Sequence, residues 1–158
     1  MPIYVKYGSV TGDVTAEGHA NWIEVNSFQW GIGRGISSPV GGTSDRESSA
    51  PSISEIVVTK PSDAASYKLL DDALQGEGQD VTIDFCKTDK GKLEIFLSYE
   101  LSNTLISGYS LSSGGDRPSE SLSLNFTKVA MKFVEMKVKN DTGTPASVTY
   151  DLGQAKVV

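Results

Sequence analysis

A chain of 158 residues is long enough for one domain that buries about 68–70% of its unfolded surface, so it needs no disulfide or metal to hold a core. Acidic residues outnumber basic ones by 20 to 14, and the net charge of −6 disfavours nucleic-acid binding, which depends on Lys and Arg contacts to phosphate. The single cysteine excludes an intrachain disulfide and a thiolate metal site.

The first residues, Met1–Val14, have neither the basic start nor the apolar stretch of a secretory leader. No apolar run approaches the roughly 18 residues that a membrane span needs, so we expect no membrane insertion. An unpaired cysteine is typical of a protein made in a reducing cytosol. We therefore expect a cytoplasmic protein, which could leave the cell only by a route without a cleavable signal peptide.

Alternation of apolar and polar residues predicts two strands in the amino-terminal part, at Ile3–Tyr7 and Trp22–Ile32. The apolar phase changes within the second strand, because Val25 lies on an odd position and Phe28 on an even one. A bulge near Asn26 would reconcile the two phases and bend the strand, as rolled sheets require.

The segment Gly31–Ser52 is the largest irregular part of the sequence, because thirteen of its 22 residues are Gly, Ser or Pro. Loops longer than about 12–15 residues in a compact domain are usually functional or disordered. The large apolar residues of this loop are Ile32, Ile36 and Val40, too few to pack the segment on itself. We expect it to order against another surface.

A strand at Ile53–Lys60 and then one helix follow this loop. Pro61 gives the helix a start signal and Gly76 an end signal. A single apolar stripe is expected on the helix, formed by Ala65, Leu69, Leu70, Ala73 and Leu74.

The rest of the chain shows strand patterns alone. They cover Val81–Cys86, Leu93–Leu101, Leu105–Leu111, Leu122–Phe126, Met131–Lys139 and Val148–Leu152. Eight or nine strands with one helix predict a mainly β fold, a rolled antiparallel sheet or barrel with the helix packed on its side. Without repeats or a linker, residues 1–158 are expected to form a single domain.

The sequence contains no complete catalytic motif. We therefore expect that the protein is not an enzyme and binds no metal or cofactor. Ile36 occupies the place of the third glycine in a dinucleotide-binding loop, and Leu93 the place of Ser or Thr in a phosphate loop. The sequence has no nucleophile-elbow motif whose serine His19 could activate, so His19 is expected in a loop or interface. Cys86 lies on a strand pattern and is expected to be a half-buried structural residue.

Four segments resemble the Hcp (haemolysin-coregulated protein) family, the tube subunit of type VI secretion systems. They are Gly12–His19, Trp22–Gly31, Ser54–Leu70 and Tyr99–Val129. The most specific part is the stretch GDRPSESLSLNFTKV at the end of the last segment. The resemblance covers nearly the whole chain in order and is less distinctive from Lys139 onward.

The resemblance implies a rolled β-barrel of two sheets that assembles with itself as a homohexameric ring. In the family, stacked rings form a hollow tube. A contractile sheath propels this tube, and a VgrG-type spike forms its tip. Effector proteins travel in the lumen. The resemblance therefore implies a structural, secreted tube subunit that takes part in virulence and bacterial competition.

The resemblance also implies roles for particular residues. In the family the strand matching Ser27–Gly31 contributes to the inner wall, and alternation makes Gln29 the lumen-facing candidate. The family's extended loop, here about residues 31–52, contacts the adjacent ring. This assigns ring stacking to Arg34, Ile36, Val40, Asp45, Arg46 and Glu47. In the turn of the specific stretch, we expect Arg117, Glu120 or both to make anchoring polar contacts; the alternative is two solvated charges.

Two other functions remain open from the sequence. A monomeric ligand-binding β-barrel would need an apolar internal cavity, yet the large core residues look able to fill a small barrel. A phage-like tail tube protein would use the same mechanics in another machine.

Overall fold

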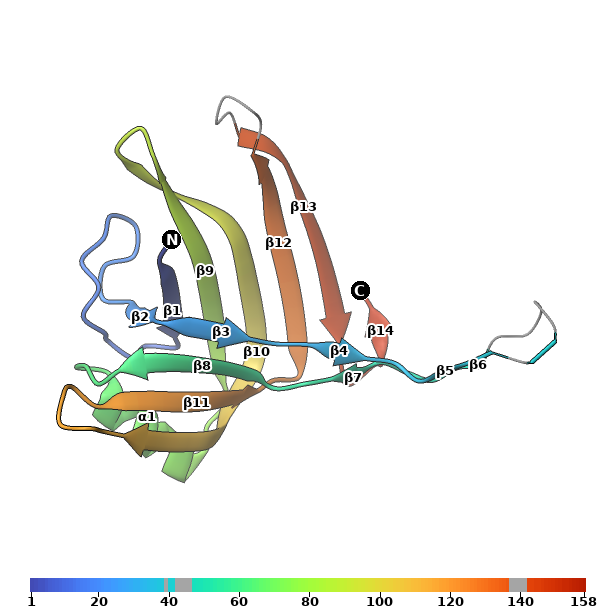
Figure 1. Cartoon of the computed structure of the whole chain (residues 1–158), viewed down its shortest axis with the longest axis horizontal. Coiled ribbons are helices and arrows are strands. Elements are labelled where there is room, and N and C mark those ends of the chain that lie inside the picture. The colour runs from blue at the N-terminus through green and yellow to red at the C-terminus, as the bar shows by residue number, and fades with distance from the viewer. Residues whose placement is uncertain (39, 42–46, 137–141) are drawn as a thin grey trace.

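The computed structural model describes residues 1–38, 40–41, 47–136 and 142–158 (Figure 1). It contains one helix, α1 (Ser66–Gln75), and antiparallel strand pairs, which confirms the expected mainly β class. The strands are β1 (Ile3–Tyr7), β2 (Ile23–Val25), β3 (Ser27–Gln29), β4 (Ile32–Gly33), β5 (Ile36–Ser37), β6 (Glu47–Ser48), β7 (Ser52–Ile53), β8 (Ile56–Pro61), β9 (Gln79–Asp89), β10 (Lys92–Ser112), β11 (Ser119–Asn125), β12 (Lys128–Met136), β13 (Thr142–Asp151) and β14 (Lys156–Val157).

Two layers of strands share β10. The first layer holds β1, β2, β9, β12, β13 and β14, and the second holds β3, β8 and β11. The first half of β10 pairs with β9 and β12, whereas its second half, from Leu105, pairs with β11. Figure 1 shows the strands of the second layer running across those of the first. The two strands that the sequence predicts at Leu93–Leu101 and Leu105–Leu111 are therefore one strand that changes layer.

The bend in β10 lies at Asn103. Its φ of 49° is in the left-handed region, and the register with β9 shifts between Leu101 and Thr104. A Cβ on Gly78 would lie 1.8 Å from Asn103 Oδ1, so the bend packs against a residue without a side chain. Such corners let one strand serve two crossed sheets.

A second crossing between the layers lies at Asn26. Val25 pairs with Ile3 in the first layer, whereas Ser27 pairs with Thr59 in the second. Between them, the backbone N–H of Asn26 donates a hydrogen bond to the Thr59 carbonyl at 2.6 Å. The change of phase expected at this position is confirmed, but its cause is the passage from one sheet to the other rather than a bulge. The expected strand Trp22–Ile32 is divided into β2, β3 and β4.

The core fills the space between the layers and the inner face of α1. Its buried apolar residues are Val5, Tyr7, Ile23, Val25, Ile56, Val58, Ala65, Leu69, Val81, Ile83, Tyr99, Leu101, Ile106, Leu122, Leu124, Phe126 and Val129. The Tyr7 hydroxyl donates a hydrogen bond to the Asp72 carboxylate and lies 3.4 Å from the Thr104 carbonyl oxygen, which brings β1, α1 and β10 together.

The apolar stripe expected on α1 is wrong in part. Ala65 and Leu69 are fully buried, but Leu70 and Leu74 are 42% and 78% exposed. Successive residues of an α-helix point about 100° apart, so Leu70 faces away from the side on which Leu69 packs. Two apolar residues of the helix are thus exposed rather than packed in the core.

The segment from Ile32 to Ile53, termed the arm, leaves the body as a narrow projection (Figure 1). Its described residues form two short antiparallel ribbons, in which Ile32 pairs with Ile53 and Ile36 with Ser48. The ribbons continue the pairing of β3 with β8. Composition alone predicted an irregular segment here, because Gly and Ser suppress the alternation that identifies a strand.

Replacing Leu69 with Ala should lower the free energy of unfolding by about 2–5 kcal/mol, because a fully buried leucine leaves a cavity. The matched control is Leu74→Ala on the same helix, which should change it by less than about 0.5 kcal/mol. Urea unfolding of both variants measures the difference. Equal losses would mean that Leu74 is buried as well.

Candidate functional site

The outward side of the second layer carries an uncharged row of hydroxyl groups. Across β3, β8, β11 and β10, Ser27 pairs with Thr59, Thr59 with Ser121 and Ser121 with Ser110. The hydroxyl oxygens of Ser27 and Thr59 lie 2.5 Å apart. Together with exposed Gln29, the surface termed the hydroxyl face consists of Ser27, Gln29, Val57, Thr59, Ser110, Ser112, Ser119, Ser121 and Ser123.

The charged residues of β8 and β11 point away from the hydroxyl face, whereas Glu55, just before β8, lies at its edge beside Gln29 and Val57. Successive side chains of a strand alternate between its two faces. Lys60 therefore shares the inward side with Ile56 and Val58, and Glu120 shares it with Leu122. Neither charge reaches the outward surface.

Lys60 and Glu120 form a buried ion pair between neighbouring strands. They face each other in the register of β8 with β11, and both side chains are 0% exposed. Lys60 Nζ donates to Glu120 Oε2 at 2.5 Å and lies 2.9 Å from Asp63 Oδ1. Ser66, the first residue of α1, donates to Glu120 Oε2 at 2.8 Å, and the Tyr109 hydroxyl donates to Glu120 Oε1. Every oxygen of the buried carboxylate is thus hydrogen-bonded.

These contacts set the ionisation of the cluster. Burial raises the pKa of Glu120, but the hydrogen bonds from Lys60, Tyr109 and Ser66 outweigh burial and hold the pKa below its ordinary value. Burial, followed by the hydrogen bond to Glu120 and its charge, raises the pKa of Tyr109 to about 12. The carboxylate is therefore charged at neutral pH and the phenol is not.

The turn at the start of the stretch GDRPSESLSLNFTKV lies beside this cluster. Arg117 Nε donates to the Ser62 carbonyl at 2.6 Å, and Ser62 N–H donates to the Pro118 carbonyl at 2.9 Å. The Arg117 side chain is 60% exposed, and its Nη2 lies 3.9 Å from Asp13 Oδ2. Arg117 thus joins the turn to the segment before α1, whereas Glu120 joins β11 to β8 from inside.

Sequence reasoning missed Lys60, although a signal for it was present. Lys60 continues the inward phase of Ile56 and Val58, and Glu120 the inward phase of Leu122. Opposite charges on the core-facing phase of two strands indicate a buried pair, because an isolated buried charge is too costly. The register that makes them neighbours is a tertiary feature.

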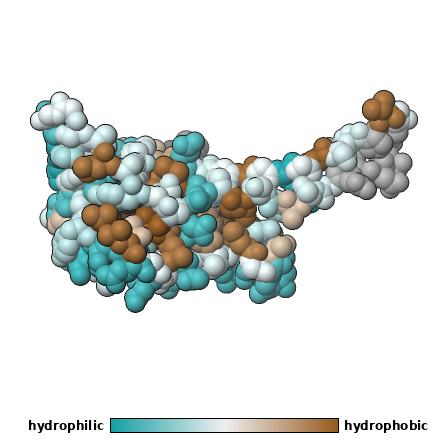
Figure 2. All heavy atoms as spheres, turned by 90° about the horizontal axis from the view of Figure 1, so that it is seen from below, coloured by the Kyte–Doolittle hydropathy of each residue, from teal (hydrophilic) through white to brown (hydrophobic). Residues whose placement is uncertain are grey.

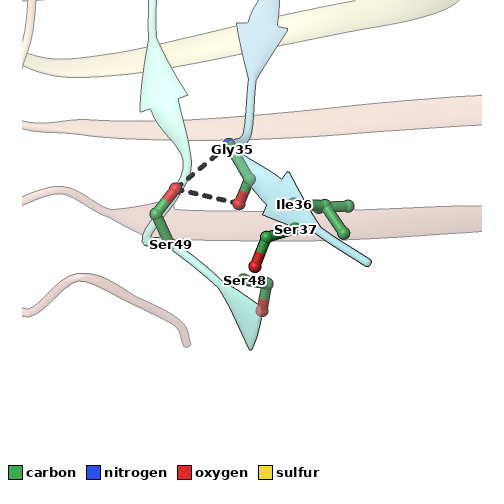
Figure 3. A pocket seen from close by; sticks show the side chains of 5 residues that line it. All are labelled: Gly35, Ile36, Ser37, Ser48 and Ser49. Carbon is green, nitrogen blue, oxygen red and sulfur yellow. Dashed lines mark hydrogen bonds between the residues drawn. The ribbon is translucent and has the colours of Figure 1, made fainter. Parts of the chain in front are cut away.

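The expected ring-stacking residues lie on the arm. Arg34 Nε donates to the Ser49 carbonyl at 2.8 Å, and the Ser49 hydroxyl bonds both backbone groups of Gly35 (Figure 3). The Ile36 side chain points away from these bonds and is 54% exposed, and Val40 is fully exposed. Asp45 and Arg46 lie outside the described residues, and the backbone of Glu47 begins β6.

His19 lies in a loop, as expected, but it is buried. Its Nε2 is 2.8 Å from Asp84 Oδ2, and its ring contacts the rings of Tyr4 and Trp22. Ser98 donates to Asp84 Oδ1 at 2.7 Å. In a Ser–His–Asp triad the imidazole lies between the hydroxyl and the carboxylate, whereas here the carboxylate lies between them. The cluster fastens the loop to β9.

Cys86 adjoins this cluster and is fully rather than half buried. Its Sγ lies 3.9 Å from His19 Nε2. Burial, and then the charge of Asp84, raise the pKa of the thiol to about 11, so the reactive thiolate is scarce at neutral pH.

Two kinds of feature are absent from the described residues. No group of three or more His, Cys, Asp and Glu side chains in that part of the chain could hold a metal ion. Likewise, none of its helices is long and apolar enough to cross a membrane.

Comparison with known proteins places the chain beside secretion proteins. The family model described as "Type VI secretion system effector, Hcp" matches residues 4–133. A solved structure of a type six secretion system protein is 28% identical, with a TM-score of 0.90 over 99% of each chain. The curated proteins contain no match.

Two further structures share the fold at lower identity. Hcp1 from Salmonella typhimurium is 21% identical, with a TM-score of 0.78 over 99% of this chain and 98% of that one. A type VI secretion system effector from Yersinia pestis is 22% identical, with a TM-score of 0.74 over 94% of this chain and 98% of that one.

Replacing Glu120 with Gln should lower the free energy of unfolding at pH 7 by about 3–5 kcal/mol, because it leaves the Lys60 ammonium buried without its main counter-charge. The matched control is Glu100→Gln, which breaks the exposed pair with Lys132 at 2.6 Å and should cost at most about 1 kcal/mol. Urea unfolding compares the two.

The pH dependence gives an independent check of this prediction. Because the pKa of Glu120 is lower in the folded state, its stabilisation is present above the ordinary value of 4.5 and is lost as the pH falls through the folded pKa. The difference in stability between the wild type and Glu120→Gln should therefore shrink below about pH 4.5. A difference that stays constant with pH would contradict the ion pair.

Proposed function

The chain belongs to the Hcp family of type VI secretion system effectors, and from this premise we propose that it is the structural subunit of the secretion tube. Six copies form a ring, and rings stack into a hollow tube. The family match over residues 4–133 carries the proposal, and the 28% identical structure with a TM-score of 0.90 supports it. The role is structural and needs no catalytic group.

The hydroxyl face is the proposed lining of the tube. Gln29, the residue expected to face the lumen, is exposed on this face beside Val57. A wall that carries many different proteins must bind none of them tightly. Fixed charges would attract cargo of the opposite sign and repel cargo of the same sign, whereas hydroxyl and amide groups exchange hydrogen bonds with water at little net cost.

The arm is the proposed contact between rings. It reaches beyond the body and carries apolar side chains that the described part of its own chain leaves uncovered. In the proposed assembly a contractile sheath surrounds the tube, a VgrG-type spike caps it, and effector proteins occupy the lumen. The subunit then leaves the cell within the tube, without a cleavable signal peptide.

Light scattering and negative-stain imaging of the purified chain test the proposal. A particle near six times the subunit mass of 16.9 kDa, seen as a ring with a central hole, is the expected result. A particle of one subunit mass at all accessible concentrations would contradict it.

Gln29→Trp should leave rings intact but reduce the amount of a co-expressed type VI effector that copurifies with them, because a large apolar ring changes the neutral lining. The control is Gln75→Trp, the same exchange at an exposed position of α1, which should retain the effector. Loss of the rings in Gln29→Trp would place Gln29 in a subunit interface instead.

A further inference from the structure

An open recess lies where the hydroxyl face meets the base of the arm. Its volume is about 470 Å³, within the range of roughly 300–1,000 Å³ that is usual for ligand sites. Its walls come from the end of β3, from the segment between β7 and β8, and from β11, and they include Gln29, Ser54, Glu55, Val57 and Ser123. Figure 2 shows both hydrophilic and hydrophobic atoms where the arm joins the body.

One of the residues that line the recess carries a charge. Glu55 precedes β8 and is exposed. By contrast, β3, the outward sides of β8 and β11, and the second half of β10 contain no Asp, Glu, Lys or Arg. The Glu55 carboxylate is therefore a single negative charge at the edge of an otherwise uncharged surface.

A hydrogen bond holds this carboxylate at the recess. The register of β10 with β11 shifts between Ile106 and Gly108, which makes Ser107 the extra residue of a bulge. A bulge re-aims the side chain of its extra residue. The Ser107 hydroxyl donates to Glu55 Oε2 and lies 3.2 Å from the Ser123 carbonyl oxygen. The second oxygen of Glu55 stays available to a ligand, because no hydrogen bond reaches it from the described part of the chain.

Two donors beside the carboxylate are already used inside the chain. Trp30 Nε1 donates to the Ser54 carbonyl at 3.1 Å, and the Gly31 N–H donates to the Ser54 hydroxyl oxygen at 2.9 Å. A carboxylate accepts hydrogen bonds without donating any, and the side-chain carbonyl of Gln29 adds another acceptor to the recess. A ligand that matches the recess therefore supplies hydrogen-bond donors and a positive charge.

Among protein side chains, arginine matches these requirements best. Its guanidinium group carries five donors in a planar fork that fits a carboxylate through two parallel hydrogen bonds, whereas lysine offers a compact ammonium group with three donors. An ion pair at an exposed position is weak. A cargo held in this way can therefore also be released.

We propose that the recess binds an arginine side chain of a cargo protein, with Glu55 as its charge partner and Ser107 as the residue that positions Glu55. The inference rests on the proposed tube function and adds the chemical class of cargo surface that the lining holds. In the proposed ring, six recesses open into one lumen. A cargo with several exposed arginines therefore gains from simultaneous contacts.

Fluorescence anisotropy with short peptides tests the recess on the purified chain. The probes are labelled peptides of sequence Ala-Arg-Ala-Arg-Ala and Ala-Glu-Ala-Glu-Ala, both with blocked ends. The wild type should bind the arginine peptide more tightly than the glutamate peptide. Glu55→Lys should weaken binding of the arginine peptide at least threefold and reverse this preference.

The matched control is Glu77→Lys, which changes an exposed glutamate just beyond α1. It is needed because the net charge of −6 attracts any basic peptide to some degree. Both variants change the net charge equally, but Glu77→Lys should keep the wild-type preference and affinity within about 1.5-fold. Equal effects of the two variants, or no binding of the arginine peptide to the wild type, would overturn the proposal.

Two further comparisons test the roles assigned to the guanidinium group and to Ser107. A lysine version of the peptide should bind the wild type at least twofold more weakly than the arginine version, and equal binding would overturn the assignment to arginine. Ser107→Ala should weaken binding of the arginine peptide at least twofold, whereas Ser107→Thr, which keeps the hydroxyl group, should retain it. Equal affinities of these two variants would overturn the positioning role.

The outcomes distinguish this inference from the proposed function, because light scattering and imaging report the rings separately. Rings that do not bind the arginine peptide would overturn the recess and leave the tube function in place. Monomers that bind it through Glu55 would keep the arginine site and overturn the tube. Rings whose binding depends on Glu55 support both.

Discussion

Both sheets depend on one strand. β10 pairs with β9 and β12 in its first half and with β11 in its second, so the bend at Asn103 sets the angle at which the two layers cross. Once that angle is set, alternation decides which side of every strand faces the core. The outward side of the second layer becomes the hydroxyl face, and the continuation of β3 and β8 beyond the layer becomes the arm.

The pair Lys60–Glu120 shows how two charged side chains are accommodated in the core of this fold. Removing two charges from water is costly, and the cost is recovered only when each charged atom is fully hydrogen-bonded. Asp63, Ser66 and Tyr109 supply those bonds. This buried cluster joins the start of α1 to β8 and β11 from the core side. It also leaves the outward side of the same strands without a formal charge.

These features are consistent with a protein whose task is mechanical. In the proposed tube, a wall that proteins pass must be neutral toward them, and a subunit that stacks must offer different surfaces to its neighbours. The hydroxyl face meets the first requirement. The arm, a projection whose described residues include the exposed side chains Ile32 and Ile36, is the surface proposed for the second.

Much of this could be read from the sequence, because strand alternation is a local property. It determined the mainly β class, the single helix and the change of phase at Asn26, and the stretch GDRPSESLSLNFTKV carried the resemblance to the Hcp family. Only the tertiary structure decided that Lys60 meets Glu120, that His19 meets Asp84, and that Leu74 faces solvent while Leu69 does not. The two pairs join residues 60 and 65 positions apart, and the faces of a helix acquire meaning only when it packs. Register and packing arise from contacts between distant segments, and no local pattern of residues encodes them.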